Sequence, residues 1–171
     1  MASNIVVETG VGLTNANSYL SVVDADTYHA NHSGSTVWSG AAEADKEKAL
    51  RLATQYLDVK YTWKGLKKLR TQVLSWPRHD VYDSDGHHVS NNAIPQALKD
   101  ACAELALRVI QGDTLLGDID EPGEIKSEDV KIGPIEESVV YVGGKSQVKE
   151  YPLIKAILKP LVKSGNLAER G

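Results

Sequence analysis

The stretch that decides the fold is PQALKDACAELALRVIQG, residues 95–112 of the 171-residue chain. Pro95 suits the first position of a helix, and Gly112 suits the position just after its end. Between them an apolar stripe recurs at helical spacing, formed by Ala97, Leu98, Ala101, Cys102, Leu105, Ala106 and Val109. The small side chains of this stripe let a second helix approach closely. The stretch therefore predicts one helix of a packed helical bundle.

Three more helices are predicted around it. Ser21 and Asp24 are spaced as in a capping box, which predicts a short helix from about Val22 to Asn31. Three acidic residues between 43 and 47 favour a helix start, and the apolar residues that follow predict a helix over about 43–59. Pro152 opens a last apolar helix. The predicted fold class is mainly α: a small bundle of three core helices plus a C-terminal helix, with long loops.

Extended segments are predicted at both ends of the chain. An apolar run over Asn4–Glu8 predicts an N-terminal strand. Residues 130–136 and 138–142 are rich in β-branched residues and precede Gly143-Gly144, which predicts a short β-arm or hairpin. Before them, residues 113–129 hold seven acidic residues and one lysine, as in an acidic linker or loop. The predicted organisation is a helical domain over 1–112, a linker over 113–129, and a β-arm with a C-terminal segment over 130–171.

Composition limits the class of protein. An apolar fraction of 42% supports a folded core, and the net charge of −4 argues against a general nucleic-acid binder. One cysteine excludes an internal disulfide framework. The sequence has neither an apolar run of about 18 residues nor a recognisable export signal, so we expect synthesis in the cytoplasm without a membrane span.

Fragments that resemble catalytic or ligand motifs are incomplete. Cys102 lies on the apolar stripe, so we expect a buried structural thiol instead of a nucleophile. Residues 143–146 end like a phosphate-binding loop, but its first glycine would fall on Val139. Asp83–Gly86 resembles part of a calcium loop without the required first and last ligands. A histidine group also lacks a complete ligand set: His79, His87 and His88. We therefore expect no enzymatic activity, no metal and no cofactor.

One basic stretch carries the remaining functional signal. It has no acidic residue and interleaves aromatic residues, a pattern that can bind single-stranded DNA or a protein partner. Its candidate contact residues are Lys60, Trp63, Lys64, Lys67, Lys68 and Arg70. The alternative is that the aromatic residues fix an irregular loop to the core while the lysines remain solvated. We favour this alternative because the chain is acidic elsewhere.

The order of these features resembles a known family. Its marks are NSYLSVVDADTYH (17–29), DKEKAL (45–50), ATQYLD (53–58), WKG (63–65), QVLSWPR (72–78), DG (85–86), IPQALK (94–99), AELA (103–106), KIGPI (131–135) and YP (151–152). The chain is similar over about residues 15–161 to the head–tail adaptor (connector) proteins of tailed bacteriophages. That family is often named DnaT-like single-stranded-DNA-binding protein.

The resemblance implies a structural role in the neck of a virion. Such adaptors form a homo-oligomeric ring, commonly dodecameric, that binds the portal protein and extends the DNA channel toward the tail. A tail-side connector, stopper or tail terminator protein would bind the other side, and DNA would pass through the lumen without specific binding. The alternative is a single-stranded-DNA-binding (DnaT-like) replication protein. The acidic net charge favours the adaptor, because a weakly repulsive channel lets DNA move.

The resemblance also assigns the C-terminal segment to portal docking. Its expected interface residues are Tyr151, Leu153, Ile154, Ile157, Leu158 and Leu161. Because the segment follows an acidic stretch and a Gly-Gly pair, we expect it to gain little from packing on its own domain. A partner groove could instead bury its apolar side chains.

Overall fold

In the computed structural model, helices dominate the part of the chain that is described, namely residues 5–32, 34–116, 125–131, 136–141 and 149–163. The helices are α1 (Val22–Ala30), α2 (Ser35–Gly40), α3 (Glu43–Lys60), α4 (Gln96–Ile110) and α5 (Pro152–Leu158). The strands are β1 (Leu66–Lys67), β2 (Arg78–His79), β3 (Ile125–Lys131) and β4 (Glu136–Tyr141). The mainly α prediction, with a small hairpin and long loops, is confirmed. Two compact units are present: residues 1–115 with 150–171, the helical unit, and residues 116–149, the hairpin unit.

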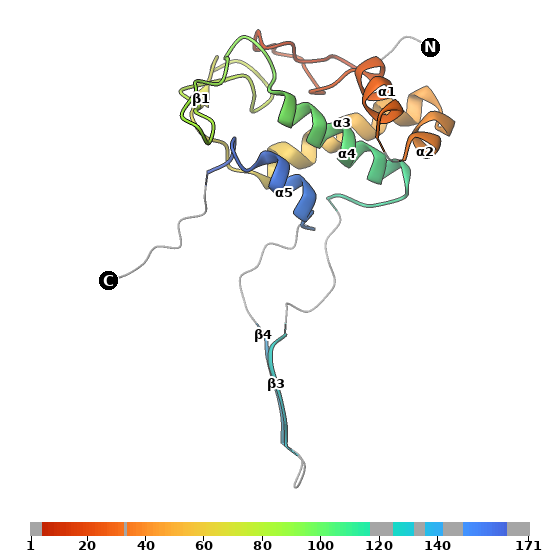
Figure 1. Ribbon diagram of the computed structural model, residues 1–171, viewed down its shortest axis with the longest axis vertical. Helices are drawn as coiled ribbons and strands as arrows, with labels where there is room; N and C mark the ends of the chain where they lie inside the picture. Colours follow the sequence, from red (N-terminus) through yellow and green to blue (C-terminus); the bar gives the residue numbers. More distant parts are fainter. Residues whose placement is uncertain (1–4, 33, 117–124, 132–135, 142–148, 164–171) are drawn as a thin grey trace. The chain divides into compact units, whose positions relative to one another are not determined.

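The core of the helical unit lies between α3 and α4, with α5 packed on α4 (Figure 1). Leu98 and Leu105 of α4 are fully buried, as is Leu50 of α3. Alanines separate these leucines on both helices, and their small side chains allow the close approach that the sequence predicts. Within the described residues, no helix combines the length and apolar character needed to cross a membrane.

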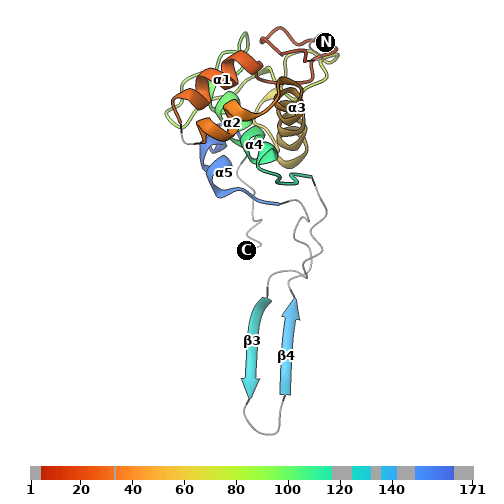
Figure 2. The same ribbon diagram turned by 90° about the vertical axis from the view of Figure 1, so that its right-hand side faces the viewer.

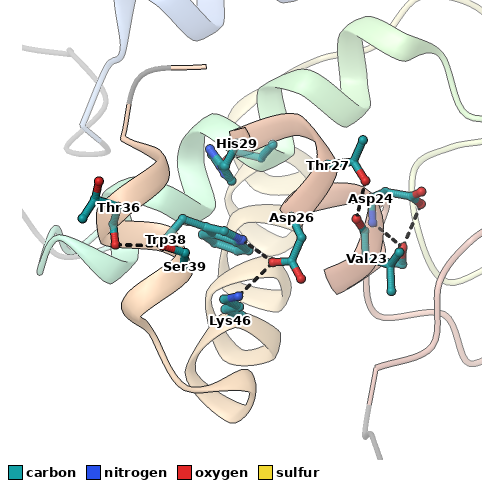
Figure 3. A network of polar contacts seen from close by, with 11 residues as sticks. Val23, Asp24, Asp26, Thr27, His29, Thr36, Trp38, Ser39 and Lys46 are labelled. Atoms are coloured by element: carbon teal, nitrogen blue, oxygen red, sulfur yellow. Dashed lines mark hydrogen bonds and ion pairs between the residues drawn. The ribbon is translucent and has the colours of Figure 1, made fainter. Parts of the chain in front are cut away.

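The α1–α2 region combines a predicted cap with an unpredicted helix. The Ser21 hydroxyl accepts a hydrogen bond from the Asp24 backbone N–H at 3.0 Å, as the capping box requires. Helix α2 was not predicted, because six residues are too short to show a helical period. Its buried Trp38 donates from the indole N–H to Asp26 at 2.7 Å. Lys46 of α3 donates to the same carboxylate oxygen at 2.8 Å, so Asp26 joins three helices (Figure 3).

The connection from α3 to α4, residues 61–95, is irregular and held by polar contacts. Its regular part is the two-residue antiparallel pair of β1 with β2. The Tyr19 hydroxyl donates to Asp58 at 2.5 Å, and the other oxygen of Asp58 accepts from the Ser75 N–H at 2.9 Å. The backbone N–H of Trp76 donates to the Tyr19 hydroxyl at 3.2 Å. These bonds tie the connection to the end of α3.

The hairpin unit contains β3 and β4, paired antiparallel (Figure 2). Lys131 pairs with Glu136, and Ile125 pairs with Tyr141 at the other end of the ladder. Strand β3 begins at Ile125, whereas the sequence predicted an extended segment from residue 130; pairing with β4 extends the strand into the acidic stretch. Gly143-Gly144 lies outside the described residues.

At the N-terminus, the predicted strand is wrong where the structure describes it. Val7 forms an isolated parallel bridge with Ser18 in place of a ladder. Two residues around it also hold the loop: the Val6 carbonyl accepts from the Asn17 N–H at 2.8 Å, and the Glu8 N–H donates to the Ser18 carbonyl at 2.9 Å. The turn-rich sequence after Glu8 folds back at once, because the Glu8 carboxylate accepts backbone N–H groups of residues 10, 12 and 13.

Candidate nucleic-acid interface

Residues 60–79 hold six basic residues and no acidic residue. None of the six is fully buried in the structure, and Lys67 and Arg70 are exposed. Trp63 differs from them: only 4% of it is exposed, and its ring packs edge-on against Trp76 at 5.9 Å between centroids. Trp63 therefore belongs to the core, as the favoured interpretation of this stretch expects, and it offers no face to a nucleic-acid base.

The lysines of this stretch bind backbone carbonyls of neighbouring loops. The Lys64 ammonium donates to the Pro160 carbonyl at 2.8 Å, and Lys67 donates to the Val73 carbonyl at 3.2 Å. Lys68 donates to the Gly10 carbonyl at 2.9 Å and to the Asn92 side chain at 2.8 Å. A carbonyl satisfies a donor without cancelling its charge. These three lysines therefore fix the loops and still contribute positive potential.

Lys60 and Arg70 complete the candidate set and differ in environment. The Lys60 ammonium lies 3.3 Å from the Glu150 carboxylate, so an acidic residue neutralises it. Arg70 is exposed, and no ion pair ties it to a carboxylate of the described residues. The predicted basic residues thus lie at the end of α3 and in the connection that follows it, and their roles differ.

The C-terminal segment brings a second basic group to this connection. Val162 forms an antiparallel bridge with Trp63, and the Lys163 N–H donates to the Thr62 carbonyl at 2.9 Å. The Lys64 N–H donates in turn to the Leu161 carbonyl at 3.0 Å. Residues 150–163 carry three lysines, and their one acidic residue is Glu150, which pairs with Lys60. We call residues 60–79 together with 150–163 the basic surface: it has nine basic residues and one acidic residue.

The C-terminal lysines are functional candidates that sequence reasoning missed. Exposed side chains of this group are Lys155, Lys159 and Lys163. Their helical spacing is visible in the sequence, but the bridge that joins them to Trp63 connects positions about 100 residues apart. Neither local periodicity nor charge pattern predicts such a contact.

The six residues expected at the portal interface lie mostly inside the helical unit. The buried ones are Tyr151, Ile154, Leu158 and Leu161. The Tyr151 hydroxyl donates to Asp113 at 2.8 Å, and the Arg108 guanidinium lies 4.9 Å from its ring centroid. Ile157 is half-buried and Leu153 is 48% exposed. The expectation that this segment packs little on its own domain is wrong, because α5 packs on α4 and four of the six side chains are buried. Contact with a portal stays a prediction.

Other candidate groups give no site. Burial raises the pKa of the Cys102 thiol to about 12, which disfavours the thiolate that a nucleophile needs. Asp83, Asp85 and His87 place one ligand atom each within 4.8 Å of one another. Asp83 already accepts the N–H groups of Asp85 and His87 at 2.9 and 2.8 Å, and Asp85 and His87 are exposed. These internal bonds account for the grouping, so we assign no metal to it.

The fold and the basic surface define a small helical protein with a cationic face. A family model described as "Putative DnaT-like ssDNA binding protein" matches residues 3–171. The chain belongs to this family. No curated protein and no solved structure matches it. The family description agrees with the alternative function that the sequence left open, and it names neither a portal nor a virion, so the adaptor role stays a prediction.

Proposed function

We propose that this protein binds single-stranded DNA through the basic surface, without reading its sequence. The observation that carries the proposal is the bridge between Trp63 and Val162, which joins two segments that are almost free of acidic residues. Cations gathered in this way attract phosphates and release the counterions condensed on the nucleic acid. The family description supports the same ligand.

The acidic net charge of the chain does not oppose this proposal, because it is unevenly distributed. Residues 116–149, the hairpin unit, hold eight acidic and four basic residues. The rest of the chain has 15 of each and is neutral overall. The whole excess of −4 therefore belongs to the hairpin unit, and the basic surface lies in the neutral remainder. Binding depends on this local charge more than on the total.

The exposed cations of the basic surface are available to phosphates. Arg70, Lys159 and Lys163 are exposed, and no ion pair joins them to a carboxylate in the described ranges. Lys155 lies in α5, four residues before the C-cap residue Lys159, so the two side chains project from the same side of the helix. In contrast, Lys60 is paired with Glu150 and contributes less.

The test is a salt titration of binding. We would measure fluorescence anisotropy of a labelled oligo-dT of about 30 nucleotides with wild type and with the triple variant Lys155→Gln, Lys159→Gln, Lys163→Gln. Each phosphate contact in a single strand contributes about 0.7 to the log–log salt slope, so the triple variant should reduce the slope by about 2. Its affinity at low salt should fall at least about tenfold.

A matched control removes charge outside the basic surface. Lys48→Gln with Lys99→Gln changes two lysines of α3 and α4 and should leave the slope unchanged. Circular dichroism checks that each variant keeps its helices. If the control and the triple variant weaken binding equally, or if wild type binds without salt dependence, the proposal is wrong. The adaptor role would then be the remaining hypothesis for this family member.

A further inference from the structure

The basic surface alone does not distinguish a single strand from a duplex, because both present phosphates. Discrimination needs contact with an unpaired base, most often by stacking on an aromatic ring. Trp63, the aromatic residue that the sequence placed in this role, is buried. We infer that Tyr82 is the residue on which a base stacks, an inference that rests on the proposed function.

Tyr82 is exposed, unlike the other Trp and Tyr side chains in the described ranges. Its exposed fraction is 52%, and the other Trp and Tyr side chains that the structure describes are buried or half-buried. An exposed aromatic ring on a soluble surface has an unsatisfied apolar face, which a nucleobase can cover. Exposure therefore separates Tyr82 from the aromatic residues that build the core.

Tyr82 also lies at the junction of the two basic segments. The Lys64 ammonium lies 3.4 Å from the Tyr82 carbonyl and 2.8 Å from the Pro160 carbonyl. One lysine thus joins the backbone that carries Tyr82 to the end of α5, between Lys159 and Lys163. A DNA strand that follows these cations passes the backbone that carries Tyr82.

The ring is held in place by its own small hairpin. Tyr82 forms a backbone bridge with His88, and the two rings pack edge-on with centroids 5.6 Å apart. The preceding residue, Val81, is fully buried and accepts the Val89 N–H at 2.9 Å. A ring held in this way loses less conformational entropy when a base stacks on it.

The acidic residues that follow Tyr82 do not block this use. Both N–H bonds to Asp83 draw its carboxylate into its own turn, and they keep its pKa below the usual value. Asp85 is exposed at the tip of the turn and opposes phosphate binding there. The expected ligand is therefore a single DNA strand that stacks one base on Tyr82 and contacts the lysines of the basic surface with its phosphates.

The experiment compares two nucleic acids and three substitutions. Binding of oligo-dT and of a blunt DNA duplex would be measured with Tyr82→Ala, Tyr82→Trp and the control Val23→Ala, which changes an exposed apolar side chain of α1 outside the basic surface. A stacked base is worth about 1–3 kcal/mol, so Tyr82→Ala should weaken oligo-dT binding about 5- to 150-fold. Duplex affinity should change less than about twofold, and the salt slope should not change, since no phosphate contact is removed. Tyr82→Trp should retain binding, and Val23→Ala should match wild type.

A direct readout keeps this inference separate from the proposed function. Oligonucleotides with 5-iodouracil would be photo-crosslinked to the full chain, and the attachment site mapped by mass spectrometry. Attachment at Tyr82 supports the inference. Salt-dependent binding with unchanged affinity in Tyr82→Ala, or attachment elsewhere, overturns the inference and leaves the proposed function standing. Absence of salt-dependent binding in wild type overturns the proposed function, and absence of attachment at Tyr82 then overturns the inference as well.

Discussion

The helices and the connection between α3 and α4 are stabilised in different ways. Between α3, α4 and α5, buried apolar side chains face one another, and few polar side chains take part. In residues 61–95, side chains bind backbone carbonyls that no regular ladder satisfies. Arg78 shows this best, since its guanidinium donates to the carbonyls of Lys64, Gly65 and Ser75. The positive charges of the basic surface therefore also hold its loops, so charge and folding are coupled there, whereas the packing between α3, α4 and α5 depends mainly on apolar burial.

The largest expected effect comes from the helical side. Ile154 and Leu158 are fully buried, and each substitution to alanine should destabilise the protein by about 2–5 kcal/mol. The double variant Ile154→Ala, Leu158→Ala therefore loses most of the roughly 5–15 kcal/mol that folds a typical domain. We expect a lost or strongly shifted urea transition. Leu153→Ala, at an exposed position of the same helix, should change stability by less than about 1 kcal/mol. A double variant as stable as this control would show that α5 is not part of the core.

The second effect tests the connection. Arg78→Met removes three hydrogen bonds from a charged donor, with lengths of 2.6, 2.7 and 3.1 Å. The free energy of unfolding should fall by about 2–3 kcal/mol, because the carbonyls lose this partner in a partly buried setting. Arg70→Met is the matched control, since Arg70 is exposed, and it should change stability by less than about 0.5 kcal/mol. Equal urea midpoints for the two variants would contradict the role given to Arg78.

The smallest effect is a difference in pH dependence. Burial lowers the pKa of His29, so its contribution to stability is complete above the ordinary histidine pKa of about 6.5 and is lost as the pH falls through that value. Burial raises the pKa of Asp58, so its contribution is lost as the pH rises above the ordinary aspartate pKa of about 3.9. His29→Gln should flatten the acid loss, and Asp58→Asn should flatten the opposite slope. Urea unfolding from about pH 4 to 7.5 measures both, and slopes of the same sign would rule out this assignment.

The helices and residues 61–95 also differ in how far the sequence predicts them. Helices α1, α3, α4 and α5 follow from caps and apolar spacing, because both signals are local. The contacts of the connection are not local: Lys68 bonds to Gly10 and Asn92, and Trp63 pairs with Val162. Burial of Tyr151 and Ile154 could not be predicted either, since an amphipathic helix shows that it needs a partner without showing which one.

For the candidate site, the sequence predicts the residue types but does not predict which side chains are exposed to a ligand. The lysines of residues 60–70 stand out by charge, but Trp63 and Tyr82 cannot be ranked as stacking residues from sequence. Trp63 is buried because it packs on Trp76, and Tyr82 is exposed because it lies on a small turn. Stacking ability depends on that difference in burial, which only the fold supplies.

The position of α5 after the hairpin unit has a consequence for synthesis on the ribosome. Helices α3 and α4 leave the ribosome before α5. The apolar surface that Ile154 and Leu158 cover therefore stays open until the ribosome has made the whole of residues 116–149 and then α5. Domains generally fold as units in the order in which they are made, and exposed apolar surface during that interval promotes aggregation. This chain must therefore postpone completion of its first-made unit, and the translation time of the hairpin unit sets how long that apolar surface stays uncovered.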